Sequence, residues 1–192
     1  MADIKIAIGM PCMTGSIRMQ AVISIVKIIS SLKYKRDFIF VNNTLIHVAR
    51  RNIALQAQKL GSTHLLFLDS DMVVEGNVVD RLLAHDKDII GVNAYQKALP
   101  RVTTVRKKLD DTHYMDADVP DTLFKCDALG TGCMLINMRV FDIIDKPWFF
   151  FDTQDEYPMG EDIWFCRQAT RKGLEIWCDP TIPVKHVGEF EY

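Results

Sequence analysis

The stretch from His64 to Asp71 reads HLLFLDSD, an apolar run that is ended abruptly by two acidic residues. A continuous apolar run of this length is typical of a strand buried on both faces, as in a parallel sheet covered by helices. In an extended chain the side chains of Asp69 and Asp71 point to the same side, about 7 Å apart, and can share one cation. The stretch therefore predicts a buried strand with two carboxylates at its carboxyl end.

The segments on either side of this strand alternate between strand and helix patterns. Apolar residues recur at three- and four-residue steps from Thr44 to Leu60, which is typical of an amphipathic helix. Asn43 or Thr44 is placed to cap this helix, and Gly61 to end it. Strands alternating with helices predict an α/β fold with a mostly parallel central sheet and helices on both faces. The predicted strands are 4–10, 38–41, 64–68 and 88–92, and the predicted helices are 16–33, 44–60 and 77–85.

Beyond Tyr95 the pattern changes to short strands joined by polar turns. No repeat, low-complexity tract or Gly/Ser/Pro-rich linker interrupts the sequence. We therefore predict a single domain over 1–192, with a first half 1–95 and a mixed α+β half 96–192. The strands expected in the second half are 102–106, 123–127, 133–137 and 181–185, with helices near Val140 and over 162–171.

The composition is that of an ordinary globular chain of 192 residues, 48% hydrophobic, with a formal net charge of −2. This charge gives no global field to attract nucleic acid or anionic lipid, so an anionic ligand must be bound locally. Five cysteines, an odd number without CxxC spacing, argue against a disulfide framework or a structural zinc site. No stretch approaches the ~20 apolar residues of a membrane span. We expect a soluble cytoplasmic protein with reduced thiols, no transmembrane segment and no nucleic-acid partner.

Polar residues follow three of the predicted strands where each strand ends: Pro11 to Thr14, Asn42 with Asn43, and Asp69 to Asp71. Ligands of an open parallel sheet bind at the carboxyl ends of its strands, so these residues are expected along one edge. Paired carboxylates at such an edge suit Mg²⁺ or Mn²⁺. The alternative is that the pair only ends a strand and caps the next turn, as Asp and Ser often do.

Two enzyme classes place an acidic pair of this kind after an apolar strand. Haloacid-dehalogenase-type phosphatases use DxDxV, which Asp69 to Val73 would supply, and GT-A glycosyltransferases use DxD. The phosphatase motif belongs on the first strand, and its second acidic pair ends a further apolar strand. Here the motif follows the third strand, and the later pair, Glu161 and Asp162, opens a helical segment. A Mg²⁺-dependent phosphatase is therefore the less favoured alternative.

Several short motifs are distributed over most of the chain. They are Arg51-Asn52, Ala57, Gly61, the 65–71 stretch, the strand 88–91 with Tyr95 and Lys97, Gly130 to Ile136, Gly160-Glu161-Asp162 and His186-Val187-Gly188. Each motif is weak alone. Their order and spacing together resemble the GT-A, family-2-like glycosyltransferases, particularly the short versions found in bacteria and their viruses.

The resemblance implies a GT-A (Rossmann-like) fold and transfer of a sugar from a nucleotide-diphosphate sugar to the hydroxyl of a glycan or other acceptor. Half 1–95 would bind the nucleotide and half 96–192 the acceptor. Asp69, Asp71 and His186 would hold Mn²⁺ or Mg²⁺, which neutralises the charge that grows on the leaving nucleoside diphosphate. The residues implied for nucleotide binding are Pro11, Cys12, Asn43, Arg51, Asp69, Ser70, Asp71 and Lys97.

The resemblance also implies a catalytic role for the acidic pair. Asp162, or else Glu161, would accept the proton of the acceptor hydroxyl if the enzyme inverts configuration, and would only orient substrate if it retains configuration. The alternative is that both carboxylates are ordinary first-turn partners of the helix dipole. For His186 the alternative is a surface histidine without a ligand.

Three further alternatives remain open. Arg50 or Arg51 pairs with phosphate, or both lie on a solvated helix face. Trp148 is expected in the core, or at most as a stacking wall for an acceptor sugar. The non-enzyme alternative for the whole chain is a module that binds a nucleotide sugar without turning it over.

Overall fold

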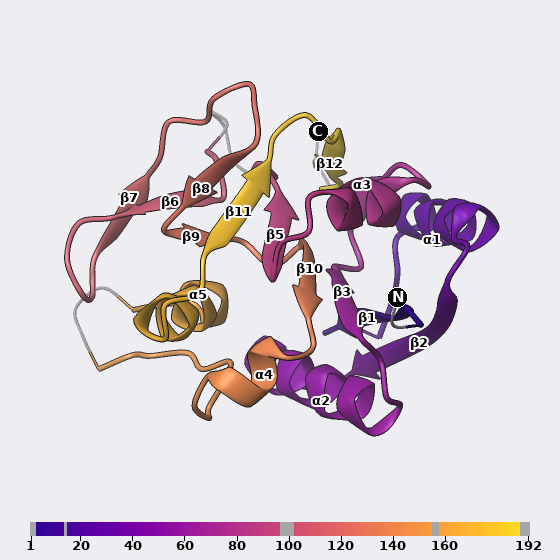
Figure 1. Ribbon diagram of the computed structural model, residues 1–192, viewed down its shortest axis with the longest axis horizontal. Coiled ribbons are helices and arrows are strands. Elements are labelled where there is room, and N and C mark those ends of the chain that lie inside the picture. The colour runs from indigo at the N-terminus through magenta and orange to yellow at the C-terminus, as the bar shows by residue number, and fades with distance from the viewer. Residues whose placement is uncertain (1–2, 14, 97–101, 155–157, 189–192) are drawn as a thin grey trace.

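The computed structural model of the chain describes residues 3–13, 15–96, 102–154 and 158–188. Within these residues, the centre is a seven-stranded sheet in the order β2-β1-β3-β10-β5-β11-β8, and two smaller sheets have the orders β12-β4 and β7-β6-β9 (Figure 1). The strands are β1 Lys5–Cys12, β2 Lys35–Asn42, β3 His64–Leu68, β4 Met72–Val74, β5 Ile89–Val92, β6 Val105–Lys108, β7 Tyr114–Asp116, β8 Phe124–Cys126, β9 Ala128–Leu129, β10 Cys133–Asn137, β11 Ile176–Asp179 and β12 Val184–His186. The helices are α1 Met19–Ser31, α2 Ile46–Lys59, α3 Val78–Ala84, α4 Val140–Ile143 and α5 Glu161–Arg171.

Most strands of the central sheet run in one direction. β2, β1, β3, β5 and β11 are mutually parallel, and β10 and β8 run against them. The predicted α/β class with a mostly parallel sheet is therefore confirmed. β10 lies between β3 and β5, so a strand from the second half of the chain occupies the middle of the sheet. Its apolar residues Cys133 to Ile136 are all buried there, which suits a central position.

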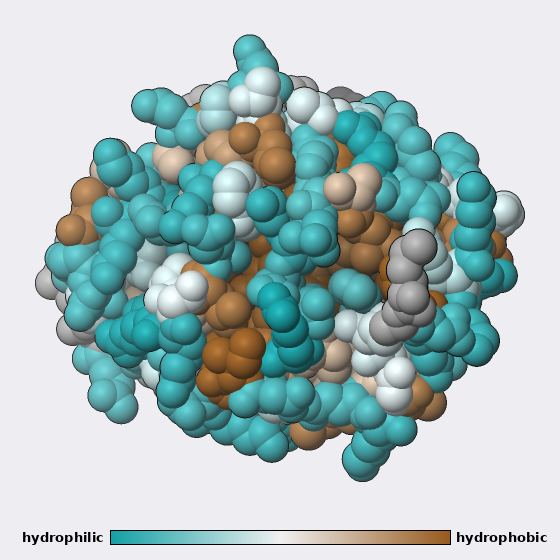
Figure 2. Space-filling view, in the orientation of Figure 1, coloured by the Kyte–Doolittle hydropathy of each residue, from teal (hydrophilic) through white to brown (hydrophobic). Residues whose placement is uncertain are grey.

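Helices cover both faces of this sheet (Figure 1). α2, α4 and α5 pack on one face through a core that includes Ile53 and Phe165, and α1 and α3 pack on the other through Ile28 and Leu82. Hydrophilic side chains cover most of the face shown in Figure 2, with apolar side chains visible between them. In the described part of the chain, no helix is both long and apolar enough to cross a membrane.

α2 approaches β1 closely at Gly9. A Cβ atom on Gly9 would lie 2.2 Å from Cγ2 of Ile53, so a residue with a side chain could not fit without a shift. A crossover helix runs back against the strands that it connects, so its first turns lie near the carboxyl ends of those strands. Arg50, one turn before Ile53, is thereby brought to the edge where ligands of such sheets bind.

The start of α2 differs from the prediction. Its N-cap is Leu45, without a hydrogen bond from the cap side chain, so the prediction that Asn43 or Thr44 caps the helix was wrong. Asn43 instead adopts a left-handed backbone conformation, with φ of 51°. Asparagine tolerates this region better than most residues, and the residue serves to turn the chain after β2.

The last strand is displaced by a few residues from the predicted 181–185. It is β12, and it pairs antiparallel with β4, a short strand that the sequence did not predict. In this register His186 lies opposite Met72, which directly follows the acidic turn. The pairing therefore brings two segments more than a hundred residues apart to one place.

Candidate functional site

The acidic turn, Asp69 to Asp71, directly follows β3 at the carboxyl edge of the parallel strands. The Met72 amide donates a hydrogen bond to the Asp69 carbonyl over 3.0 Å, and the Arg18 amide donates to the Ser70 carbonyl over 3.1 Å. The turn is therefore fixed both internally and by the loop after β1. It borders a cleft of about 330 Å³. The residues lining the cleft are Pro11, Met13, Ser16, Arg18, Ile46, Asp69, Ser70, Asp71 and His186.

Arg50 ties the acidic turn to the first turn of α5. Its Nη1 and Nη2 donate to the two carboxylate oxygens of Asp69 at 2.9 and 3.2 Å, and its Nε donates to Oε1 of Glu161 at 3.0 Å. The side chain is only 3% exposed, and its guanidinium lies 5.4 Å from the centre of the Phe67 ring. Burial alone would lower the pKa of Arg50, but the charges of Asp69 and Glu161 outweigh burial and raise it. A permanently charged cation therefore holds both carboxylates in place.

Asp162 follows in the first turn of α5. Its Oδ1 accepts a hydrogen bond from the Ile163 amide over 2.8 Å. Burial, and after it the neighbouring charge of Glu161, raise the pKa of Asp162 to about 6. A carboxylate with this pKa is ionised at neutral pH and is a stronger base than an ordinary aspartate, so it can take up a proton during a reaction.

A cavity lies beside the first turn of α5, which carries Asp162. A Cβ atom on Gly160 would lie 2.9 Å from Oδ1 of Asp162, so glycine lets the carboxylate lie against the backbone. Arg106 is near enough for its charge to interact with Asp162. Gly160 and Arg106 both line a cavity of about 370 Å³, together with residues of the β6–β7 hairpin.

His186 and Asp71 meet across the β4–β12 pairing. Nε2 of His186 lies 3.3 Å from Oδ1 of Asp71, and the Val187 amide donates to the Asp71 carbonyl over 2.8 Å. Nδ1 of His186 lies 3.1 Å from the backbone carbonyl oxygen of Tyr95. A carbonyl only accepts hydrogen bonds, so Nδ1 carries the proton and, in the neutral ring, Nε2 presents a lone pair toward the cleft.

The Asp71 and His186 pair fits a divalent cation in part. Two ligand atoms at right angles, each about 2.1 Å from a metal, would lie about 3.0 Å apart, which is near the separation of these two atoms. Both carboxylate oxygens of Asp69 accept hydrogen bonds from Arg50. In the described ranges no group of three or more His, Cys, Asp or Glu side chains is arranged to hold a metal. The protein would therefore supply two ligands, and water or a bound ligand the others.

The other sequence-predicted residues are spread around this site. Pro11 and Ser70 line the cleft, and Cys12 is buried at the end of β1, where burial and then the charge of Asp69 raise the pKa of its thiol. Asn43 is exposed, with its side-chain oxygen 3.5 Å from the Cβ position of Gly15. Lys97 lies outside the described residues.

Arg51 does not join the acidic cluster. It is exposed on α2 and bonds the side chain of Asn52, whereas Arg50 makes the buried contacts. The helical period contains the signal for this choice, because Arg50 falls on the same face as the buried Ala49, Ile53 and Ala57.

Thr131 is a buried residue to which the sequence motifs assign no role of its own. This residue is 1% exposed, and its hydroxyl has no hydrogen-bond partner within the described part of the chain. Thr131 precedes Gly132, whose carbonyl accepts a hydrogen bond from the Asp69 amide. A buried hydroxyl next to the acidic turn is therefore a further polar group of the site.

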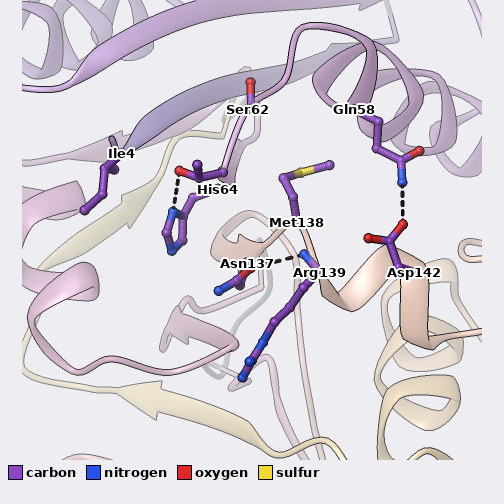
Figure 3. Close-up of a pocket in the computed structure, with 9 residues that line it drawn as sticks. Ile4, Gln58, Ser62, His64, Asn137, Met138, Arg139 and Asp142 are labelled. Carbon is purple, nitrogen blue, oxygen red and sulfur yellow. Dashed lines mark hydrogen bonds between the residues drawn. The ribbon is translucent and has the colours of Figure 1, made fainter. Parts of the chain in front are cut away.

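A second cavity, of about 580 Å³, lies at the opposite end of the strands (Figure 3). Its polar side chains largely bond one another: Thr63 bonds His64, Asn137 accepts from the Arg139 amide, and Gln58 bonds Asp142. The Arg139 guanidinium is also paired with Asp88 through two hydrogen bonds. The named side chains are thus occupied with one another, although the buried Ser62 hydroxyl has no partner in the described part of the chain. The cleft at the acidic turn, with its converging carboxylate and imidazole, is the better candidate site.

Comparison with solved structures identifies similar folds at low sequence identity. The structure of A197 from STIV matches with a TM-score of 0.65 and 16% identity, over 97% of this chain and 86% of that one. The fold is GT-A-like. The inositol-1-phosphate CTP transferase from T. maritima matches with a TM-score of 0.53 and 10% identity, over 97% of this chain and 90% of that one.

A third match is S. aureus TarS, residues 1–349, in complex with UDP-GlcNAc. Its TM-score is 0.53 at 10% identity, over 98% of this chain and 60% of the TarS chain. No protein-family model matches the sequence, and no curated protein matches it. The likeness therefore extends to the fold and leaves the reaction to be argued from the site.

Proposed function

We propose that the protein is a glycosyltransferase that moves a sugar from a nucleotide-diphosphate sugar to an acceptor hydroxyl with the help of Mn²⁺ or Mg²⁺. The observation that carries the proposal is the cleft in which Asp71 and His186 converge, with Arg50 linking the same turn to the carboxylates of α5. The GT-A-like fold supports it, as does the UDP-GlcNAc bound to TarS on a similar fold. In this proposal half 1–95 binds the donor and half 96–192 the acceptor.

Asp71 and Nε2 of His186 would hold the cation. When bound, the cation neutralises the charge that develops on the leaving nucleoside diphosphate. The Tyr95 carbonyl orients the His186 ring by accepting the Nδ1 proton, so the ring keeps its lone pair toward the cleft. Asp69, held by Arg50 through both oxygens, would orient the donor and keep the turn in place. Pro11 and Ser70 would contact the nucleotide part of the donor from the cleft wall.

Asp162 would act on the acceptor side. Its raised pKa and the cavity beside it suit a base that accepts the proton of the attacking hydroxyl, in an inverting reaction. Glu161 is engaged by Arg50 and would position the first turn of α5. The donor cleft and the acceptor cavity would then be connected through the cluster of Arg50, Asp69, Glu161 and Asp162.

A panel of nucleotide sugars, incubated with the protein and Mn²⁺ with and without simple acceptors, tests this function. We expect one donor to release nucleoside diphosphate slowly. Release of phosphate from phosphomonoesters instead would favour the phosphatase. Tight binding of one donor without turnover under any acceptor would favour a non-catalytic nucleotide-sugar-binding module.

Replacement of Asp71 tests the metal-binding part of the proposal. Mn²⁺ should strengthen binding of a nucleoside diphosphate to the unmodified protein, and Asp71→Ala should abolish this gain because one of two protein ligands is lost. Calorimetric titration with and without Mn²⁺ measures both. Asp80→Ala, which removes a first-turn carboxylate of α3, is the control and should keep the gain. Equal affinity with and without Mn²⁺ in the unmodified protein would remove the metal site from the proposal.

His186→Ala should weaken Mn²⁺-assisted binding of the nucleoside diphosphate but leave the fold intact. The residue is exposed on a short strand, so its loss should change the free energy of unfolding by no more than about 0.5 kcal/mol. His113→Ala, which removes a half-buried histidine of the β6–β7 hairpin, serves as the control. A large drop in melting temperature with an unchanged response to Mn²⁺ would make His186 a structural residue.

A further inference from the structure

α1 is apolar on its outer side as well as on its inner side. Ala21, Ile25 and Ile28 are buried against the sheet. On the opposite side Met19 and Val26 are 70% and 54% exposed. The complete outer row is Met19, Val22, Ile23 and Val26, which are between 38% and 70% exposed. A globular surface helix normally presents polar residues to water, so this outer row is unusual for a helix on the surface.

The row is continuous along the helix. Its members are spaced by three or four residues, so they lie on one stripe, which is about 10 Å long at 1.5 Å per residue. Gln20 and Lys27 are the polar residues beside it, and both are exposed. An exposed apolar stripe with a basic residue at its edge is the surface that a membrane-bound helix presents to lipid.

The charged residues in the segment that contains α1 are all basic. Between Gly15 and Arg36 the sequence has five basic residues and no acidic one, although the whole chain has a formal net charge of −2. The basic residues are Arg18, Lys27, Lys33, Lys35 and Arg36. Lys35 is paired with Asp3, and the exposed Lys27 and Lys33 lie nearer to the outer row. A partner that covers the row should therefore be apolar in its interior and anionic at its surface.

We propose that α1 docks the protein on an anionic lipid membrane, lying in the plane of the headgroups with its outer row inserted. A second copy of this chain fits less well, because a two-fold contact through this row would bring the same basic residues face to face. α1 and β2 lie at one edge of the molecule, with α3 beside α1 on the same face of the sheet (Figure 1). The outer row is exposed along its whole length, so a flat surface that approaches this edge can contact it.

A membrane bound to α1 would lie close to the cleft at the acidic turn. Met13, Ser16 and Arg18 line the cleft and lie immediately before α1 in the chain. A membrane that holds α1 therefore lies next to the mouth of the cleft. The docking itself does not depend on the proposed transfer reaction, and a protein without transferase activity would bind membranes equally well.

Co-sedimentation with lipid vesicles tests the proposal. The full chain should bind vesicles that contain phosphatidylglycerol, bind pure phosphatidylcholine vesicles more weakly, and lose affinity as salt is raised. The double variant Ile23→Ser with Val26→Ser should lower the affinity about tenfold, because it removes apolar surface that would be inserted. Lys27→Gln with Lys33→Gln should lower it several-fold for the anionic vesicles only.

The matched control is Leu60→Ser with Ile143→Ser. These residues are 44% and 41% exposed and belong to the layer of α2 and α4, on the other face of the sheet. This variant should bind vesicles as the unmodified protein does, and all variants should keep its melting temperature because each change is on the surface. Absence of vesicle binding, or equal losses in the control and in the α1 variant, would overturn the proposal. So would light scattering that shows a dimer in the unmodified protein and a monomer after Ile23→Ser with Val26→Ser.

Discussion

Asp162→Asn should lower the rate of sugar transfer about 10²- to 10⁴-fold while donor affinity stays nearly unchanged. The amide has the shape of the carboxylate, and its oxygen can still accept the hydrogen bond of the Ile163 amide. It cannot take up the proton of the attacking hydroxyl. The loss corresponds to about 3 to 5 kcal/mol of barrier, against a few tenths for a changed charge in the first turn of a helix. Release of nucleoside diphosphate measures the rate, and calorimetry measures the affinity.

The same residue should set the pH dependence. A base must be ionised, so the rate should rise as the pH passes through about 6 and level off above it. The folded state raises the pKa of Asp162 above its ordinary value of 3.8, so ionisation costs stability above pH 6 and nothing below about pH 4. Asp162→Asn should therefore raise the melting temperature at pH 8 and leave it unchanged near pH 4.

The control for this prediction is Asp80→Asn, which removes a first-turn carboxylate from α3. It should change neither the rate nor the pH profile. A rate for Asp162→Asn within threefold of the unmodified enzyme would exclude Asp162 as the base. It would direct attention to Glu161, to a retaining reaction, or to a protein that binds nucleotide sugars without transferring them.

The sequence predicted those elements whose structure is set by the pattern of apolar residues within the element itself. The apolar run 64–68 is β3 with the same ends, and the three- and four-residue spacing of 44–60 is α2 to within two residues at the start and one at the end. β10 was also predicted with its observed ends. A strand buried on two faces and an amphipathic helix each produce a recognisable pattern of apolar residues in a short stretch of sequence.

The parts that the sequence did not predict depend on pairing between distant segments. The local pattern of 133–137 predicts a strand but not its position between β3 and β5. The pattern of 72–74 does not predict that this segment pairs with the last strand. The resemblance to glycosyltransferases grouped Asp71 with His186, and the β4–β12 pairing is the physical reason that the two side chains meet. Loops and short edge strands have weak patterns of their own, so their positions are set by the rest of the fold.

The choice between Arg50 and Arg51 also depends on contacts between distant segments, which the local sequence does not reveal. Two adjacent arginines on a helix differ by 100° in direction, and only one of them can reach the interior. The motif resemblance pointed to Arg51, and the structure brings Arg50 to Asp69 and Glu161. Arginine side chains are rarely buried, so the sequence alone predicts that both arginines are exposed. Only the fold reveals the two carboxylates that compensate the cost of burying the Arg50 charge.

Arg50→Met should destabilise the protein by about 3 to 5 kcal/mol, the cost of removing one partner from a buried ion pair. Methionine fills the aliphatic space but leaves Asp69 and Glu161 without the cation that accounts for three hydrogen bonds. The midpoint of urea unfolding measures the loss.

Two matched variants decide what the loss means. Arg51→Met removes the same charge one residue away from an exposed position, and should change stability by no more than about 0.5 kcal/mol. Arg50→Lys keeps a charge but cannot bond Asp69 through two parallel hydrogen bonds and Glu161 through a third, so its stability should fall between that of Arg50→Met and the unmodified protein. Equal losses for Arg50→Met and Arg51→Met would show that the buried cluster does not hold the two halves of the site together. A full loss for Arg50→Lys would instead show that the geometry of the guanidinium, rather than its charge, fixes the acidic turn against α5.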